Sequence, residues 1–271
     1  MGRIANTFRR LRKANEAALI PYLTVGYPSL DATRQLVPVI ARQGADLIEL
    51  GVPFSDPMAD GATVQRSSEA ALNNGVNLAT CLRVAADARR ANDVPLLFMS
   101  YYNPILTYGV ERFARSCVAA GIDGLIVPDL PPEEAEELKS ACTEVGIDLI
   151  FLVAPTSTDE RLRRVAEMAS GFIYCVSLTG VTGARTELSQ GIKAMLDRVR
   201  RYTALPLVVG FGISTPEHVR TISHMADGAV VASALINYIE TLAEDDMVTG
   251  VSEFVRDLKA ATVREVSAVS G

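Results

Sequence analysis

The chain has 271 residues, of which 49% are apolar and 21% are charged, and this composition is ordinary for a globular protein. Its net charge of −6 argues against binding to nucleic acid, and no apolar run reaches the roughly 20 residues of a membrane-spanning helix. The N-terminus has no signal-peptide core, so we expect a cytoplasmic protein that binds neither nucleic acid nor membrane.

The first residues predict an amphipathic helix. Ile4, Phe8 and Leu11 recur at helical spacing, while Arg9, Arg10, Arg12 and Lys13 form the polar face. The basic run is therefore interpreted as a solvated helix face rather than a nucleic-acid site. We expect this segment to be an N-terminal capping helix on the main fold.

Eight short apolar runs follow, and they are predicted to be strands. Their nearly continuous hydrophobicity is typical of parallel strands that are covered on both faces. Helical segments separate them, for example Glu133–Glu144 and Asp159–Ala169, the latter with Thr158 as its N-cap. The predicted strands are Ala18–Val25, Asp46–Leu50, Leu96–Tyr101, Gly124–Val127, Ile147–Val153, Phe172–Ser177, Leu205–Gly210 and Gly228–Val231.

This alternation predicts an α/β fold, and the length is close to the roughly 250 residues of a (β/α)₈ TIM barrel. No linker or low-complexity tract interrupts the chain, so residues 1–271 are expected to form one barrel domain. An open, doubly wound sheet remains the structural alternative at this point.

The cysteines and histidines do not have the spacing of a metal site. Cys81, Cys117, Cys142 and Cys175 are far apart in the sequence and are interpreted as reduced, buried thiols. His218 and His224 form no recognised ligand pattern. We therefore expect neither metal nor cofactor, and chemistry that uses carboxylates, hydroxyls and backbone groups.

Catalytic groups of a barrel gather where strands end, and two carboxylates follow the second strand. Glu49 lies within the apolar run Leu47–Leu50, where desolvation would raise its pKa toward that of a general acid or base. An exposed strand end or a structural ion pair would explain Glu49 equally well. Asp60 is a second candidate, although a helix N-cap or a turn is the simpler explanation of Asp60 alone.

The ends of the last strands suggest a phosphate site. Gly210, Phe211 and Gly212 follow the seventh strand and precede Ser214, which starts a capping-box pattern with Glu217 and has Pro216 at the helix start. With Ser233 after the eighth strand, this corner can hold an anion on backbone N–H groups, although a plain tight turn is possible. The glycine-containing segment Leu178–Gly191 is expected to be a mobile lid or a long linker.

Several longer motifs carry a resemblance to a known family. The segment Ile48–Gly61 closely resembles the signature of the tryptophan synthase α-subunit family. Further similar segments span nearly the whole chain in the order that a (β/α)₈ barrel requires. They are Tyr22–Gly26, Tyr102–Pro104, Val127–Pro131, Ser177–Gly183 and Gly210–Ser214.

The resemblance implies a lyase that converts indole-3-glycerol phosphate into indole and glyceraldehyde 3-phosphate by retro-aldol cleavage. It implies that Glu49 is the acid/base, that Asp60 accepts a hydrogen bond from the indole N–H, and that Tyr174 lies near the acid/base. Tyr22 and Phe211 would bound the indole ring. Thr182 would order the closing loop against Asp60.

The resemblance also implies a phosphate site and a partner. The phosphate would rest on Gly183, Gly212, Ile213, Ala232 and Ser233, with Ala232 where glycine is common in the family. Indole would pass to a β subunit within an α2β2 tetramer, and the interface would include Pro53, Asp56, Asn103 and Pro104.

Three alternative functions remain open from the sequence. The first is a stand-alone indole-3-glycerol phosphate lyase that releases free indole with the same catalytic residues. Another sugar-phosphate barrel enzyme of the same pathway is disfavoured by the segment that carries Glu49 and Asp60. A catalytically silent barrel that only activates a partner is disfavoured by the intact set of Glu49, Asp60 and Tyr174.

Overall fold

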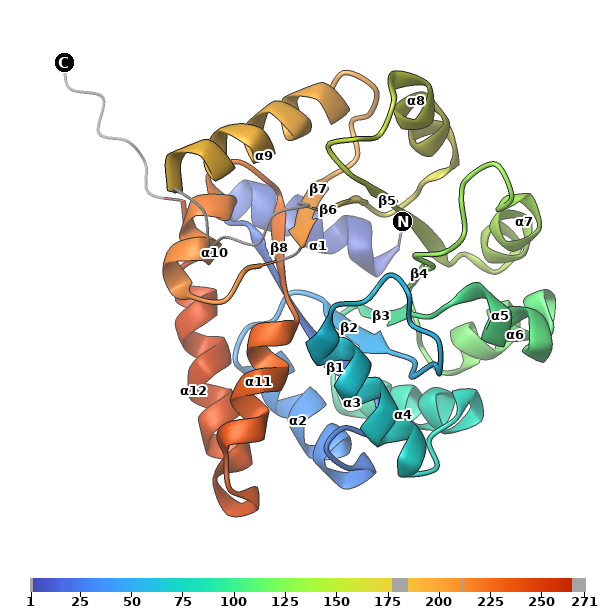
Figure 1. The fold of residues 1–271 in the computed structure, drawn as a ribbon, viewed down its shortest axis with the longest axis vertical. Helices are drawn as coiled ribbons and strands as arrows, with labels where there is room; N and C mark the ends of the chain where they lie inside the picture. Colours follow the sequence, from blue (N-terminus) through green and yellow to red (C-terminus); the bar gives the residue numbers. More distant parts are fainter. Residues whose placement is uncertain (1, 177–184, 211, 265–271) are drawn as a thin grey trace.

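The computed structural model describes residues 2–176, 185–210 and 212–264, without the side chains of 185–189. Eight parallel strands pair in chain order and close into a barrel, which confirms the predicted (β/α)₈ architecture and excludes the open sheet. Figure 1 shows the strands at the centre with the helices around them. The strands are β1 (Ala18–Thr24), β2 (Ile48–Gly51), β3 (Leu96–Met99), β4 (Gly124–Ile126), β5 (Asp148–Val153), β6 (Ile173–Val176), β7 (Leu207–Gly210) and β8 (Gly228–Val231).

The helices lie outside the barrel and return the chain to the start of each next strand. They are α1 (Arg3–Ala14), α2 (Leu30–Arg42), α3 (Ala62–Asn73), α4 (Leu78–Ala91), α5 (Tyr102–Tyr108), α6 (Val110–Ala119), α7 (Glu136–Val145), α8 (Asp159–Met168), α9 (Arg185–Val199), α10 (Pro216–Ser223), α11 (Ser233–Thr241) and α12 (Met247–Ala260), with a 3₁₀ turn at Glu244–Asp246. In the described part of the chain, none of these helices combines the length and apolar character that a membrane crossing requires.

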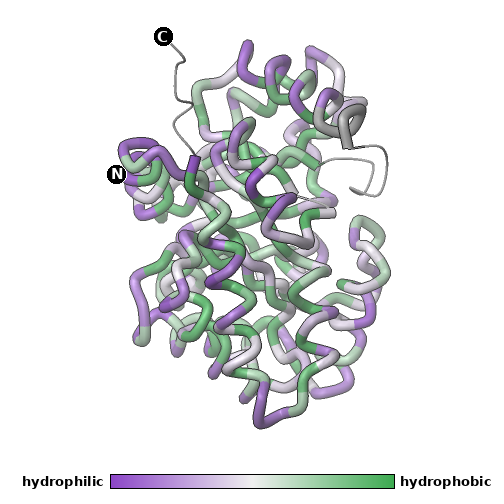
Figure 2. The backbone as a smooth tube through the Cα atoms, turned by 90° about the vertical axis from the view of Figure 1, so that its left-hand side faces the viewer, coloured by the Kyte–Doolittle hydropathy of each residue, from purple (hydrophilic) through white to green (hydrophobic). Residues whose placement is uncertain are grey.

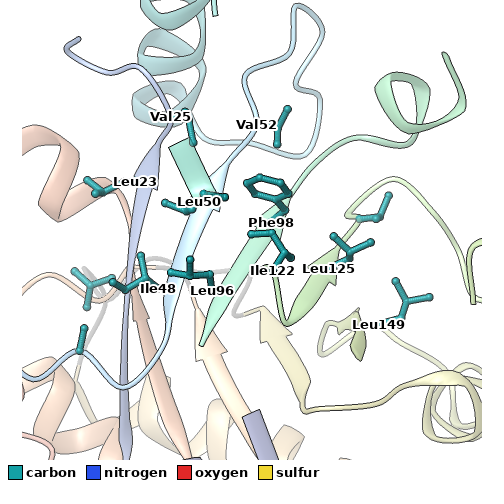
Figure 3. Close-up of a cluster of buried hydrophobic side chains, with 14 of the residues drawn as sticks. Leu23, Val25, Ile48, Leu50, Val52, Leu96, Phe98, Ile122, Leu125 and Leu149 are labelled. Carbon is teal, nitrogen blue, oxygen red and sulfur yellow. The ribbon is translucent and has the colours of Figure 1, made fainter. Parts of the chain in front are cut away.

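The strand residues alternate between two apolar layers. Leu23, Ile48, Leu50 and Phe98 face outward and pack beneath the helices, as the close-up of this layer in Figure 3 shows. Their inward-facing neighbours fill the barrel in a separate cluster that includes Ile20, Leu97, Ile126, Val208 and Val230. Hydrophilic stretches lie largely toward the outside of the trace (Figure 2). The strands are therefore apolar on both sides, as parallel strands in this fold must be.

Helix α1 closes the amino-terminal end of the barrel, as predicted. Its apolar residues Ile4, Phe8 and Leu11 are all buried. The Phe8 ring lies 5.8 Å from the ring of Phe172, which directly precedes β6. Because Ile4 also reaches the first residue of β4, the helix fills the bottom of the barrel and leaves only the opposite end open.

Several predicted boundaries need correction. Helix α7 begins at Glu136 rather than Glu133, because turn residues follow the two prolines before it. Thr158 is confirmed as the N-cap of α8, where its hydroxyl accepts a hydrogen bond from the Arg161 N–H at 3.2 Å. The capping box at Ser214 was wrong, because Thr215 caps α10.

The predicted lid or linker at residues 178–191 also needs correction. Residues 185–191 belong to helix α9, so the irregular segment cannot extend to Gly191. Residues 178–184 of that prediction lie outside the described residues.

Candidate active site

A cavity of about 460 Å³ opens at the carboxyl end of the barrel strands. Every described residue with a predicted role in catalysis, substrate binding or phosphate binding lines this cavity. They are Tyr22, Glu49, Asp60, Tyr174, Gly212, Ile213, Ala232 and Ser233. Thr182, Gly183 and Phe211 lie outside the described residues.

Glu49 lies on β2 and faces the barrel interior, because its neighbours Ile48 and Leu50 face the helices. The side chain is only 1% exposed. Both of its carboxyl oxygens lack a hydrogen-bond partner among the described residues. Burial, together with the negative charge of Asp60, raises the pKa of Glu49 to about 8. Glu49 is therefore neither an exposed strand end nor part of a structural ion pair.

Two tyrosines flank Glu49 within the barrel. Tyr22 lies beside it in the register of β1 and β2, and Tyr174 lies on β6. Burial and the charges of Glu49 and Asp60 raise the pKa of both phenols, so both stay protonated. The cavity thus holds two hydroxyl groups that can donate or accept hydrogen bonds.

Glycines on the neighbouring strands make room for these tyrosines. A Cβ atom at Gly51 would lie 2.0 Å from the hydroxyl oxygen of Tyr22, and one at Gly210 would lie 2.3 Å from that of Tyr174. Any side chain at either glycine would displace the adjacent ring. Sequence reasoning missed the role of Gly51, although a glycine at the end of a barrel strand is a usable signal of close approach.

Asp60 belongs to the loop between β2 and α3. The N-cap position of α3 is Gly61 and no side chain caps the helix, so the helix-cap explanation of Asp60 was wrong. Burial raises the pKa of Asp60 to about 6, against a hydrogen bond from the Tyr101 hydroxyl that lowers it. At neutral pH this carboxyl is therefore ionised, while that of Glu49 keeps its proton.

Tyr101 positions this loop, and the sequence analysis did not identify it. Its hydroxyl accepts a hydrogen bond from the Ala59 N–H at 2.9 Å, and its ring stacks on Phe54 at 5.1 Å. The residue comes just after β3, the strand next to β2. An aromatic hydroxyl at the end of a neighbouring strand could have indicated this role.

The expected phosphate corner belongs to the same cavity, because Gly212, Ile213, Ala232 and Ser233 line it. Gly212 has a φ of +74°, a left-handed conformation that favours glycine. Helix α11 starts at Ser233, and no side chain caps it, so its first N–H groups remain available to an anion. Ala232 has a φ of −108°, so this position does not require glycine.

Ser214 and His218 also line the cavity, near this corner. Nδ1 of His218 lies 3.2 Å from the Ser214 hydroxyl and 3.4 Å from the Ser214 backbone nitrogen. No role was predicted for either histidine, because their spacing does not match a metal site. Within the ranges that the structure describes, no group of three metal-ligating side chains comes together.

The expected interface residues do not share one environment. Asp56 and Asn103 are exposed, and Pro104 is partly buried. Pro53 is buried in the isolated chain, and its place in the interface stays a prediction.

Comparisons with known proteins agree with this geometry. A model of the tryptophan synthase alpha chain family matches residues 8–263. The chain is 60% identical to the tryptophan synthase alpha chain of Roseiflexus castenholzii over 260 residues, covering 96% of this chain and 100% of that one. Identity to the alpha chain of Chloroflexus aggregans is 51% over 265 residues, covering 97% and 99%. A crystal structure of tryptophan synthase from M. tuberculosis, in an open form with BRD0059 bound, has a TM-score of 0.89 at 36% identity, covering 98% of this chain and 100% of that one.

Proposed function

Because the chain belongs to the tryptophan synthase alpha chain family, we propose that it cleaves indole-3-glycerol phosphate into indole and glyceraldehyde 3-phosphate. The observation that carries this proposal is the carboxyl group of Glu49, which is buried at the cavity wall with no partner among the described residues. A neutral carboxylic acid in such a place is suited to proton transfer.

Glu49 acts as both acid and base in the proposed reaction. The bond from indole C3 to the glycerol chain cannot break while the ring keeps its aromatic enamine form. Protonation of C3 by Glu49 gives an indoleninium ion, which accepts the electron pair when the bond breaks. The Glu49 carboxylate then takes the proton of the neighbouring hydroxyl group, and the aldehyde forms. A pKa of about 8 supports the first step, because the acid still holds its proton at neutral pH.

Asp60 accepts the hydrogen bond of the indole N–H and stabilises the positive charge that develops on the ring. This role needs an ionised carboxylate, which is consistent with the pKa of about 6. Tyr174 lies beside the acid, and Tyr22 and Phe211 bound the indole ring. Thr182 orders the closing loop against Asp60, an assignment that rests on the resemblance alone.

The phosphate binds at Gly183, Gly212, Ile213, Ala232 and Ser233. The uncapped N-terminus of α11 and the left-handed turn at Gly212 support this placement, because both present backbone N–H groups to an anion.

A β subunit is the partner, in an α2β2 assembly in which indole passes from this chain to the β subunit. The interface includes Asp56, in the loop after β2, and Asn103 and Pro104, in the first turn of α5 after the neighbouring strand β3. Two exposed apolar side chains lie in the same segments, Met58 at 93% and Leu106 at 48% exposure, and they support a protein contact there. The interface also includes Pro53, which is buried in the loop that carries Asp56.

The hydrogen bond between Tyr101 and Ala59 offers a route from that interface to the active site. Tyr101 directly precedes α5, which carries Asn103, and it also bonds to Asp60. A partner that presses on α5 or on the loop at Asp56 therefore moves the group that holds Asp60. Closure that excludes water would follow from this movement.

Residues 1–271 form one domain, as the nearly complete match to the family supports. The protein is cytoplasmic. Its four cysteines are free and buried, which is consistent with a reducing compartment.

Indole release from indole-3-glycerol phosphate tests the function directly. We expect the isolated chain to turn over slowly and a cognate β subunit to accelerate it. Equal rates with and without the partner would favour a stand-alone lyase. No indole from either preparation would contradict the proposed function.

A further inference from the structure

The cavity has an unusual charge balance for an enzyme that binds a phosphate ester. Its wall carries the carboxyl groups of Glu49 and Asp60. Among the described residues that line it, none is a lysine or an arginine, and His218 is the only side chain able to carry a positive charge. The dianionic phosphate must therefore be held in the same cavity as an ionised Asp60, without a lysine or arginine among the described lining residues.

His218 is fixed in place by the loop before α10. Its backbone N–H donates to the Thr215 hydroxyl at 3.3 Å, within the cap of that helix. Nδ1 of its ring faces the Ser214 backbone N–H at 3.4 Å and the Ser214 hydroxyl at 3.2 Å. Since a backbone N–H can only donate, Nδ1 is the acceptor, and the proton of the neutral ring lies on Nε2.

Nε2 has no hydrogen-bond partner among the described residues. It donates a hydrogen bond in the neutral ring and in the charged ring alike. The ring therefore offers one N–H donor on a side chain that lines the same cavity as Ile213 and Ser233, the first residue of α11.

We propose that His218 binds the phosphate of the substrate through Nε2–H, as a side-chain addition to a site otherwise made of backbone N–H groups and the Ser233 hydroxyl. This inference rests on the proposed function, because it assumes a phosphorylated substrate in this cavity. His218 then sets the preference for phosphorylated over unphosphorylated ligands. Indole, which has no phosphate, does not depend on it.

The test is a comparison of ligand affinities in His218→Phe and His218→Asn with those of the wild-type chain, because Phe has no donor and the Asn amide is too short to reach the position of Nε2. Glycerol 3-phosphate is the phosphate probe and indole is the control ligand, each measured by titration calorimetry. Loss of a hydrogen bond to a charged group should weaken glycerol 3-phosphate binding by about tenfold or more. Indole affinity should stay within about twofold, which also reports that the variants are folded.

Steady-state kinetics give a second readout. The KM for indole-3-glycerol phosphate should rise in both His218 variants while kcat changes little, because the contact is remote from the bond that breaks. His224→Asn is the matched control. His224 follows the same helix, is exposed and does not line the cavity, and its Nδ1 lies 2.8 Å from the carbonyl oxygen of Arg220.

The outcomes separate the two hypotheses. Wild-type affinity for glycerol 3-phosphate in both His218 variants would overturn the assignment of His218 and leave the proposed function intact. A fall in kcat with unchanged KM would also overturn it. A wild-type chain that neither binds glycerol 3-phosphate nor releases indole would refute the proposed function, and the assignment with it.

Discussion

A buried carboxyl group lies at each end of the barrel, and the two differ in whether they have hydrogen-bond partners. At the amino-terminal end, Asp46 is 5% exposed and fully partnered. It accepts hydrogen bonds from Arg10 at 2.8 Å, from Lys259 at 2.9 Å and from the Leu19 N–H at 3.0 Å. The contacts tie α1, α12 and β1 together at the closed end.

At the carboxyl-terminal end, Glu49 is still more buried and has no described partner. The cost of burying a charge there is met by keeping the proton, so the pKa rises to about 8. The groups that stabilise this fold and the groups that carry out its chemistry therefore lie at opposite ends of the barrel. A carboxylate that is paired holds the barrel together, whereas a carboxyl that is left unpaired beside a cavity keeps a proton to transfer.

The largest expected effect is on activity at the open end. Glu49→Gln removes the transferable proton and keeps the shape of the side chain. We expect turnover to fall by about 10²–10⁴-fold, the usual contribution of a positioned acid or base. Indole release assays measure this, and retention of more than about a tenth of the activity would contradict the role of Glu49.

The same variant should not lose stability, because no described hydrogen bond depends on Glu49. Its pKa in the folded chain lies above the ordinary value of 4.5, so the fold loses stability progressively as the pH rises from about 4.5 to about 8. Glu49→Gln removes this loss. Urea denaturation at pH 6 and pH 9 measures the free energy of unfolding. Relative to the wild type, the variant should be more stable at pH 9 than at pH 6.

Asp46→Asn is the matched acid-to-amide change at the closed end. It should lower the free energy of unfolding by about 2–3 kcal/mol, because Arg10 and Lys259 lose a buried anionic acceptor. Turnover of the folded protein should stay within about twofold of wild type. If Asp46→Asn reduced turnover as strongly as Glu49→Gln, the contrast between the two ends would be wrong.

The pH profile of kcat/KM should show two limbs at the open end. The rate needs ionised Asp60 and protonated Glu49, so it should rise through a pH of about 6 and fall through a pH of about 8. Tyr101→Phe removes a hydrogen bond that lowers the pKa of Asp60. The acid limb should therefore move to higher pH, while the basic limb stays. An unchanged acid limb would show that Tyr101 does not influence the pKa of Asp60.

The smallest expected effect is that of Tyr22→Phe. The Tyr22 hydroxyl accepts a hydrogen bond from Thr24 at 3.3 Å, but Thr24 also bonds to Ser67 at 2.6 Å and keeps that contact. The loss of stability should be below about 1 kcal/mol, with turnover within a fewfold of wild type. Thermal unfolding and the indole assay measure both, and a loss as large as that of Glu49→Gln would make Tyr22 a catalytic group.

Much of the fold could be predicted from local patterns. The run Gly228–Val231 matches β8 residue for residue, and Ile4, Phe8 and Leu11 correctly indicate the capping helix. Boundaries were less predictable where a turn competes with a helix, as at Ser214, where the next residue provides the cap instead. Cap choice depends on which hydroxyl reaches a free N–H, and hydrophobic spacing does not encode this.

The sequence by itself determined the period of two along each strand, which puts Glu49 on the face opposite to that of Ile48 and Leu50, whereas the closed barrel made that face the interior. It also determined the order of the elements, which places the ends of all eight strands at one rim. Only the tertiary structure decided that Glu49 would have no described partner, that Tyr101 would hold Asp60, and that His218 would be the only basic side chain among the described lining residues. These facts depend on contacts between residues that lie far apart in the chain and come together in the closed barrel. Hydrogen-bond partners, burial and pKa values follow from those contacts and not from the local sequence.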